Sequence, residues 1–407
     1  MSIQYNFIEK MINIQGLKIN FVDKIGEIIH VNGEIENSIG VCPKCGNTTN
    51  KEHDYRTQKY QHLDMCGQNV ILYIEVKRYV CECDKEHPFS EIVPFARRYQ
   101  RQTIAYEEYI YELCHKNTIK NVSEVTGLGE EPVQSIYNYY ANKAIEESKK
   151  ETGRENIYLG MDDIAKKKGH NYNTVLYDQD RKELIEIIDG RTIEEVRTAI
   201  YKIFSEEERK KVKAVSIDMS STYAGVVKEC FPNAKIVIDR FHISQQLQKQ
   251  IDEARKHIQN KARKETGDKY IALGIKWSLL KKFEDLTNEE MNKLLDVCEE
   301  YPGIGDCLYL KEEFSKFFKI EVKESANAFM DYYIGLVNDY EIPELKEFGK
   351  TLNHWREGIL NYYDYGISNG FVEGMNNKIK TIKRRAYNYR NANNYRTRLL
   401  EECSKCA

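Results

Sequence analysis

The sequence predicts a mixed α/β protein of several domains, and three observations indicate this fold class. Cysteines cluster in a strand-rich segment near the N-terminus. Strand and helix patterns alternate between residues 157 and 240, and several of these strands end in aspartate. Residues 240–350 have an almost wholly helical pattern and separate that segment from a basic helix or helix pair at 366–400. A chain of 407 residues has room for roughly two to four such domains.

The composition excludes several classes of protein. Hydrophobic residues make up 41% and charged residues 31% of the chain, as is typical of a globular protein with a large polar surface. No run of about 18 apolar residues occurs, so we expect no membrane span. The first residues lack the basic head and apolar block of a secretory signal, so we expect a cytoplasmic protein.

The cysteine-rich segment predicts a small metal-binding module. Residues 1–35 suggest a short helix and then strands, and residues 40–95 read as a strand-rich unit with a β run at 70–76. Five of the eleven cysteines fall between Cys42 and Cys83. Cys42 and Cys45 form a Cys-x-x-Cys turn followed by Gly46, which lets two thiolates converge on one metal ion.

Cys81 and Cys83 supply the second pair of thiols. Their Cys-x-Cys spacing is unusual, so the fourth ligand is either Cys83 or His87, while Cys66 is not expected to bind. A structural zinc ion explains this clustering in a reduced compartment better than disulfides do. The alternative is a set of free buried thiols.

Residues 100–150 change to a helical period and contain a candidate helix-turn-helix. In the stretch 118–137, two glycines form a turn and Pro132 lies in the first turn of the second helix. That helix would present Gln134, Ser135 and Asn138 outward, as a helix does when it reads a DNA major groove. A plain helical connector is the alternative.

Residues 156–240 predict the sheet that carries the candidate active site. Strands are expected at 156–163, 170–178 and 184–188, then a helix at 193–204, and further strands at 212–218 and 234–239. Three antiparallel strands and then a helix suggest the opening of a ribonuclease H-like fold. Asp162, Asp163, Asp218 and Asp239 stand at or near strand ends, where sites gather in α/β sheets. Converging carboxylates can hold two Mg²⁺ ions, whereas an isolated strand-end acid is usually only solvated.

Several long motifs together give the chain a family resemblance. They are CPKCG with the later RYVCEC and PFSE, the helix-turn-helix, LGMDDIAKKKGHNYNTVLYD, SIDMSSTYAGVVKECFPNAKIVIDRFHI, and SNGFVEGMNNKIKTIKRRAYNYRN. In this order they resemble the bacterial insertion-sequence transposases of the ISL3 family over nearly the full length. The resemblance implies a DDE transposase in which Asp162, Asp218 and Glu373 hold two Mg²⁺ ions, with Mn²⁺ as a substitute. One departure is that the family usually has Asp-Glu where this chain has Asp162 and Asp163. Asp162 is preferred as the metal ligand because strand alternation points its neighbour away, and Asp163 is the fallback.

The resemblance also implies neighbours for these carboxylates. Asn377 and Lys380 share a helix face with Glu373, and a basic residue seven positions after the glutamate is a feature of such enzymes. Asp239 and His242 match an Asp-x-x-His element, in which His242 contacts the scissile strand or braces the site. A structural histidine beside the sheet is the alternative.

About 155 residues separate Asp218 from Glu373, which indicates a helical insertion. Trp277 lies in it and either stacks on a flipped base or packs in a helical core, and Trp355 is expected to pack. Eight basic and no acidic residues lie between Lys378 and Arg398, which favours phosphate contact over a merely solvated helix face. The expected DNA-binding residues are therefore Gln134, Asn138, Trp277, Asn377, Lys378, Lys380, Lys383, Arg384, Arg385 and Arg390.

The complete expectation is a zinc-binding domain at 1–98, a helix-turn-helix domain at 99–152, and a ribonuclease H-like domain at 153–244 and 361–407, split by a helical insertion at 245–360. The reaction is hydrolysis at transposon ends followed by attack of the 3′-hydroxyl on target DNA. The partners are double-stranded terminal inverted repeats and target DNA, with a homodimer on paired ends, in a nucleoid-associated bacterial protein. A DNA-binding regulator that has lost catalysis, and a nuclease of the same fold without strand transfer, are the alternatives.

Overall fold

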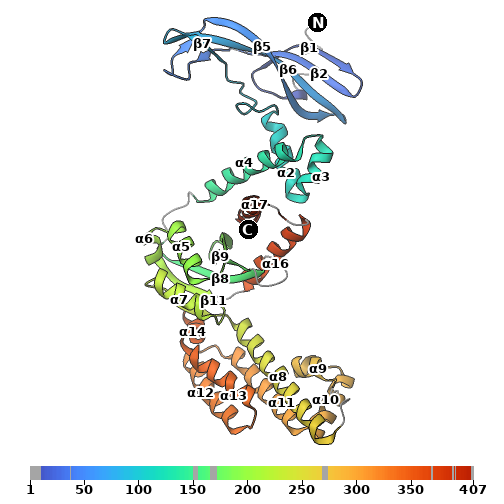
Figure 1. Ribbon diagram of the computed structural model, residues 1–407, viewed down its shortest axis with the longest axis vertical. Coiled ribbons are helices and arrows are strands. Elements are labelled where there is room, and N and C mark those ends of the chain that lie inside the picture. Colours follow the sequence, from blue (N-terminus) through green and yellow to red (C-terminus); the bar gives the residue numbers. More distant parts are fainter. Residues whose placement is uncertain are drawn as a thin grey trace. The chain divides into compact units, whose positions relative to one another are not determined.

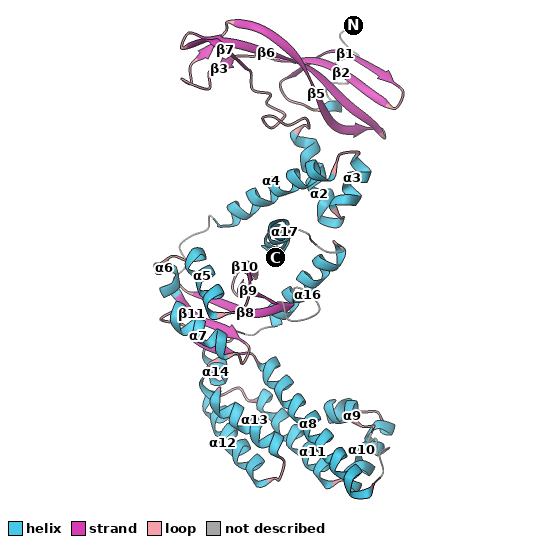
Figure 2. Ribbon diagram, in the orientation of Figure 1, coloured by secondary structure: helices cyan, strands magenta, loops and turns pink. Residues whose placement is uncertain are grey.

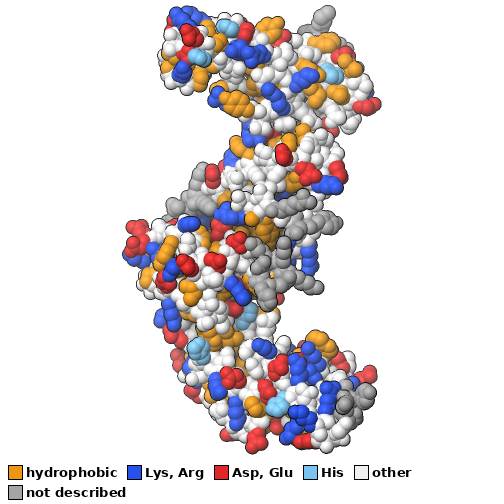
Figure 3. Space-filling model, in the orientation of Figure 1, with side chains coloured by type: hydrophobic (Ala, Val, Ile, Leu, Met, Phe, Trp, Pro, Cys, Tyr) orange, Lys and Arg blue, Asp and Glu red, His pale blue; other side chains and the backbone are white. Residues whose placement is uncertain are grey.

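The computed structural model describes residues 11–36, 38–149, 155–165, 172–267, 274–367, 370–386, 389 and 391–404. The chain divides into two compact units, Met1–Ala144 and Ile145–Ala407, each with its own core (Figure 1). Charged side chains of both signs are spread over the face of each unit that Figure 3 shows. In the described part of the chain, none of the helices has the length and apolar character needed to span a membrane.

A twisted sheet forms the first part of unit 1, as the strands in Figure 2 show. It contains β1 (Leu17–Ile25), β2 (Ile28–Ile35), β5 (Glu52–Met65), β6 (Gln68–Cys81) and β7 (Asp84–Ser90) in the order β1-β2-β6-β5, with β7 also paired to β6. Strand β6 alternates buried and less buried residues, and Val70, Leu72, Ile74 and Val76 line the core. The short strands β3 (Gly40–Val41) and β4 (Thr48–Thr49) form a separate hairpin, and the turn between them contains Cys42 and Cys45.

Three helices complete unit 1: α2 (Ile104–Lys116), α3 (Ile119–Thr126) and α4 (Glu130–Lys149). Thr103 and Thr118 cap the first two through side-chain hydrogen bonds, which satisfy backbone N–H groups at the helix starts. Gly127 ends α3 in the left-handed conformation at φ 70°, where glycine has no Cβ clash. The predicted sequence of helix, glycine turn and helix is therefore confirmed.

Unit 2 is built on a five-stranded mixed sheet in the order β10-β9-β8-β11-β12. Its strands are β8 (Ile157–Ala165), β9 (Tyr172–Asp178), β10 (Glu183–Asp189), β11 (Val212–Ile217) and β12 (Lys235–Ile238). Strands β8, β9 and β10 are antiparallel, whereas β11 runs parallel to both β8 and β12. The five strands expected from the hydrophobic pattern are all present.

Helices cover both faces of this sheet because alternate residues of each strand point to opposite sides. On one face, Leu159 and Leu176 pack with residues of α5 (Ile193–Ile203) and α7 (Ser221–Cys230), which are joined by α6 (Glu206–Lys211) and β11. On the other face, Val175 and Tyr177 pack with α16 (Gly370–Arg385) and α17 (Ala392–Ser404). The C-terminal basic segment is thus a helix pair.

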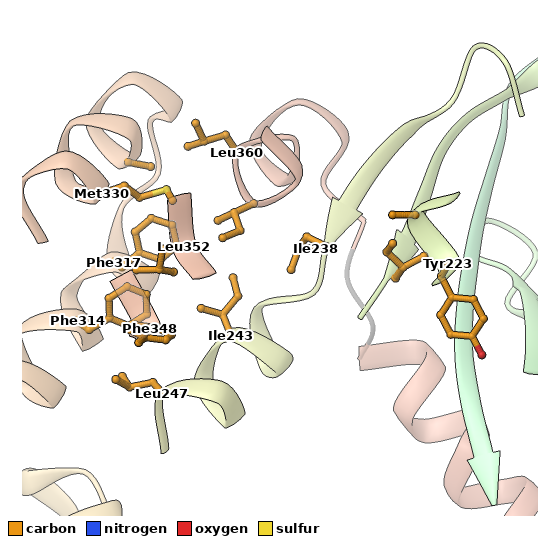
Figure 4. Packing of buried hydrophobic residues seen from close by; sticks show 14 of the residues in the cluster. Tyr223, Ile238, Ile243, Leu247, Phe314, Phe317, Met330, Phe348, Leu352 and Leu360 are labelled. Atoms are coloured by element: carbon orange, nitrogen blue, oxygen red, sulfur yellow. The ribbon is translucent and has the colours of Figure 1, made fainter. Parts of the chain in front are cut away.

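The segment between β12 and α16 is helical, as predicted. It contains α8 (Arg240–Thr266), α9 (Lys276–Leu280), α10 (Asn288–Glu300), α11 (Pro302–Ser315), α12 (Lys323–Asp339), α13 (Pro343–His354), α14 (Arg356–Leu360) and α15 (Tyr362–Tyr365). Figure 4 shows Ile243 and Leu247 of α8 pointing toward Phe314, Phe317 and Phe348 in its core. Helix α14 packs closely on β12, since a Cβ on Gly358 would lie 2.8 Å from a side-chain carbon of Ile238. This contact joins the helical segment to the sheet.

Candidate active site

The side chains of Cys42, Cys45, Cys81 and Cys83 converge in unit 1, with all four sulfur atoms within 4.8 Å of one another. The Sγ atoms of Cys42 and Cys83 are 3.6 Å apart, as are those of Cys45 and Cys81, and Cys81 and Cys83 are separated by 3.4 Å. Tetrahedral zinc with Zn–S bonds of about 2.3 Å needs sulfur separations of about 3.8 Å, so this set fits zinc.

The turn that carries Cys42 and Cys45 is preformed by the backbone. The N–H of Gly46 donates to the carbonyl of Cys42 at 2.9 Å, and Gly46 then takes φ 74°. The backbone N–H of Cys45 lowers the pKa of the Cys42 thiol to about 6, which favours the thiolate that binds metal. His87 instead contacts Asp84 through Nδ1 at 2.9 Å, so Cys83 completes the set. Cys66 lies outside it.

Asp162 and Asp163 are adjacent on β8, and their side chains point to opposite faces of the sheet. Oδ2 of Asp162 accepts a hydrogen bond of 2.8 Å from Nδ2 of Asn376 on α16. Oδ1 of Asp163 accepts one from the Tyr223 hydroxyl on α7, and its other oxygen lies 3.9 Å from Arg191. Strand alternation therefore separates the two carboxylates, as the sequence argument for Asp162 assumed.

Asn376 ties α16 to the sheet and fixes the Asp162 carboxylate. It is 6% exposed, and its Oδ1 accepts a hydrogen bond of 2.6 Å from the buried Tyr177 hydroxyl on β9. Sequence reasoning missed both residues because it followed the helix from Glu373 at four and seven positions. The position three after the glutamate lies on a similar side of the helix and would have pointed to Asn376.

Burial dominates the electrostatics of Asp162 and Asp218. It raises the pKa of the Asp162 carboxyl, and it raises the pKa of Asp218 to about 6. The nearby charges of Asp162 and Asp163 add to the rise at Asp218, and His242 opposes it at both Asp162 and Asp218. The parallel register of β8 and β11, in which Gly160 pairs with Ser216, places Asp162 and Asp218 near each other, each two residues further along the chain.

One buried oxygen at this edge has no hydrogen-bond partner in the structure, namely Oδ1 of Asp218. A buried carboxylate oxygen without a partner is costly, and a hard divalent cation is the ligand that relieves such a cost. The donor chemistry of Asp162 and Asp218 thus fits Mg²⁺ or Mn²⁺. Asp239 is also buried, at the start of α8, and His242 lies in the first turn of that helix, partly buried.

Glu373 lies on α16, one turn before Asn376, and is exposed. Among the described residues, the four cysteines are the only acidic, histidine or cysteine cluster of three or more within 4.8 Å, so Glu373 does not converge that closely with Asp162 and Asp218. Glu373, Asn377, Lys380 and Arg384 are all exposed and follow one another at helical spacing along the solvent side of α16.

The basic stripe after Glu373 divides into exposed and internally paired residues. Lys383 donates to the carbonyl of Ala165 at 3.1 Å, and Lys378 donates to that of Glu402. Further ion pairs within unit 2 are made by Arg385 and Arg398 with Glu402, and by Arg396 with Glu186. Arg390 lies outside the described residues. Lys380 and Arg384 are the exposed cations among the described residues of α16.

Two other expected DNA contacts lie on exposed or partly exposed surfaces. Trp277 on α9 is 72% exposed, with Nζ of Lys276 at 4.9 Å from its ring, so the alternative of a core tryptophan is wrong. Trp355 packs against the core, as expected. On α4, Nε2 of Gln134 donates to Oδ1 of Asn138 at 2.9 Å, and both side chains are partly exposed.

Comparison with known proteins identifies the class. A family model described as a transposase matches residues 159–399, and one described as a zinc-finger of the transposases IS204, IS1001, IS1096 and IS1165 matches residues 39–83. A model described as the helix-turn-helix domain of transposase family ISL3 matches residues 91–141. The protein is thus a transposase with a zinc ribbon, a helix-turn-helix and a DDE transposase domain.

The chain belongs to the ISL3 family, since the transposase model alone spans more than half of it. It is 27% identical to the transposase for insertion sequence element IS1001 of Bordetella parapertussis, over 86% of this chain and 85% of that protein. It is 24% identical to the transposase for insertion sequence element IS1557 of Mycobacterium tuberculosis, over 90% and 87% respectively. The zinc-ribbon and helix-turn-helix domains support DNA binding, and the four cysteines support structural zinc.

Proposed function

We propose that this transposase cuts DNA at the ends of its insertion sequence and joins them to target DNA, with Asp162, Asp218 and Glu373 as the ligands of two Mg²⁺ ions. The observation that carries the proposal is the unpartnered, buried oxygen of Asp218 beside the carboxylate of Asp162. Mn²⁺ should substitute, because it accepts the same oxygen ligands.

The sheet of unit 2 supports a ribonuclease H-like domain. Three antiparallel strands are followed by two that add to the other side of β8, and helices cover both faces. The helices from α8 to α15 then form an insertion within that domain, in line with boundaries near residues 244 and 361. The helix-turn-helix would extend over about 99–152 and the zinc-binding domain over 1–98.

Each residue near the site has a proposed task. Asp162 and Asp218 hold the cations from the sheet, and Glu373 does so from α16, the helix that Asn376 fastens to Asp162. The bound ions would activate the attacking oxygen and stabilise the leaving one. His242 contacts the scissile strand, and Lys380 and Arg384 hold phosphates along the exposed side of α16 with Asn377.

The chemistry proceeds in two balanced steps. A water oxygen attacks the phosphorus at the transposon end, the bond to the 3′-oxygen breaks, and that oxygen leaves with a proton as a free 3′-hydroxyl. The 3′-hydroxyl then loses its proton, attacks a target phosphodiester, and displaces the target's own 3′-oxygen. Because two ends must be joined together, we propose that a homodimer binds them, with Gln134 and Asn138 of α4 in the major groove.

Incubation with DNA that carries the inverted repeats flanking the gene, target plasmid and Mg²⁺ tests the proposal. Joined products are expected. Cleaved ends without joining would indicate a nuclease without strand transfer. Binding without cleavage would indicate a regulator that has lost catalysis, and either outcome would contradict the proposal.

Replacing Asn376 by alanine should slow cleavage by about 10- to 100-fold, because the Asp162 carboxylate loses the amide that orients it. The Mg²⁺ concentration for half-maximal rate should rise, while affinity for DNA stays within about twofold of the parent's. The matched variant Asn377→Ala, one residue along and exposed, should weaken DNA binding without changing the Mg²⁺ requirement. Equal Mg²⁺ titrations for the Asn376 variant and the parent would refute the positioning role.

Replacing Trp277 by alanine should remove a stacking contact with an unpaired base, worth about 1–3 kcal/mol. Its side chain is 72% exposed, so the melting temperature should hardly change. With 2-aminopurine placed at the transposon end, the fluorescence change on binding should be lost in Trp277→Ala and largely kept in Trp277→Phe. An unchanged signal in the alanine variant would exclude stacking by Trp277.

A further inference from the structure

A loop between the sheet and the helices of unit 1 presents three arginines and a tyrosine. This arginine loop, Arg97–Gln102, is fixed at both ends by backbone hydrogen bonds. The N–H of Gln61 on β5 donates to the carbonyl of Arg101 at 2.8 Å, and the N–H of Thr103 donates back to Gln61 at 2.9 Å. Ala96 pairs with Thr103 in a β-bridge that closes the loop.

The arginine loop forms one wall of a groove of about 620 Å³. The opposite walls come from the cysteine turn and from strands of the sheet. The lining includes Cys42 and Pro43 of the cysteine turn, and Arg97, Arg98, Tyr99 and Arg101 of the loop. The groove thus joins the zinc-binding turn to the segment that leads into α2.

The groove is electrostatically positive. Its one acidic residue, Glu91, is 7% exposed and accepts hydrogen bonds from the backbone N–H of Lys77 at 2.6 Å and from the Ser38 hydroxyl. Arg97 is engaged within the unit, since it pairs with the buried Glu107 and lies 3.8 Å from the Tyr139 ring. Arg98 and Arg101 are exposed, and the described residues offer neither of them an ion pair. Arg98 lies 5.0 Å from the centre of the Tyr99 ring, and Nη1 of Arg101 donates to Oε1 of Gln58 at 2.7 Å.

Exposed apolar groups stand beside these two guanidinium groups. Tyr99 is 83% exposed. Its backbone takes φ 66°, a left-handed conformation that is unfavourable for residues other than glycine. Ile92 on the same groove is 73% exposed. Unit 1 therefore holds a strained, exposed aromatic residue in a fixed loop without packing it, as expected of a residue that meets a ligand.

We propose that this groove binds the sugar-phosphate backbone of the transposon-end DNA, with Arg98 and Arg101 on phosphates and Tyr99 against the sugars. DNA is the polyanion we expect here, because the loop follows the zinc-ribbon segment and lies within the residues that the helix-turn-helix model matches, and both domains support DNA binding. Two guanidinium groups without carboxylate partners match phosphates by fork-shaped hydrogen bonds. The inference rests on the proposed function only in taking DNA as the substrate.

The test is the salt dependence of DNA binding by the full-length protein, measured by fluorescence anisotropy. In Arg98→Ala/Arg101→Ala, the slope of log affinity against log salt should fall by about 2, since each phosphate contact contributes about 0.9. The loss should be equal on repeat DNA and on a scrambled duplex, because phosphates carry no sequence information. Arg98→Lys/Arg101→Lys should keep the slope, as should Lys18→Ala/Lys24→Ala, which removes two cations from β1 outside the groove.

A slope and affinity equal to the parent's in Arg98→Ala/Arg101→Ala would overturn the proposal. So would a loss confined to repeat DNA, which would mean base reading and not backbone contact. The variant should keep one zinc per chain, which checks its fold. Failure of the proposed catalytic function would appear separately, as cleavage that persists without Asp218.

Discussion

Asp218→Asn should lower the rate of DNA cleavage by about 10³-fold or more at saturating DNA. The substitution keeps the shape of the side chain but removes the charge that would hold a cation beside Asp162. Among the described residues, Oδ1 of Asp218 is buried without a hydrogen-bond partner, so a cation would be the group that meets it. Cleavage of an end-labelled repeat in Mg²⁺ measures the rate, and binding of Mn²⁺ followed by electron paramagnetic resonance should weaken in parallel.

The same substitution should stabilise the metal-free protein. The pKa of Asp218 rises from its usual 3.8 to about 6 on folding, chiefly through burial, so the ionised form at neutral pH costs folding free energy. Because a raised carboxyl pKa gives stability at low pH that is lost as pH rises through about 6, the neutral amide should gain about 1–2 kcal/mol at pH 7 after allowing for partial exposure. Melting curves in a chelator measure this.

Asp178→Asn is the matched control, since it also replaces an aspartate at a strand end. Its carboxylate accepts hydrogen bonds of 3.0 Å from the backbone N–H groups of Asp180 and Arg181. We therefore expect lower stability and an unchanged cleavage rate well below the melting temperature. Loss of activity together with stability in Asp218→Asn would mean that Asp218, too, serves the fold alone.

Removing the zinc ion should have the largest effect on stability. Binding of structural zinc by four thiolates is worth on the order of 10 kcal/mol, and Cys45→Ser removes one ligand of the set. We expect this variant to lose its zinc, to lose the cooperative melting of unit 1 and to stop binding repeat DNA. Unit 2 has its own core and should melt as in the parent.

Metal analysis and calorimetry together test this expectation. Cys66→Ser is the control, because Cys66 is exposed and lies outside the cluster. It should retain one zinc per chain and parent-like melting. One tightly bound zinc and an unchanged calorimetric trace in Cys45→Ser would contradict the four-cysteine site.

The spacing of apolar residues along the chain predicted the helices and strands, because each kind of element repeats its buried side chains at its own period. The apolar runs that became β8, β11 and β12 are buried strands, and Gly127 marked the turn before α4. The choice of Asp162 over Asp163 rested on the same alternation, and the two side chains do face opposite helices.

Tertiary packing decided what local pattern could not. The Cys-x-Cys pair left Cys83 and His87 open until the sulfur atoms could be placed in space. Asn376 stands three positions after Glu373, but only the packing of α16 on β8 and β9 shows that its amide lies between Asp162 and Tyr177. The sequence predicted that the basic residues after Glu373 form one DNA-facing surface. In the structure, Glu402 of α17 forms ion pairs with two of them, Arg385 and Arg398.

The central claim is that a glutamate on α16 completes a metal site with two aspartates of the sheet. The most direct measurement is the cleavage rate of Glu373→Gln on repeat DNA in Mg²⁺, at saturating DNA. Glu373 is exposed, so its replacement should leave the fold unchanged. The account predicts a rate lower by about 10³-fold with DNA affinity retained, and a variant that cuts as fast as the parent would contradict it.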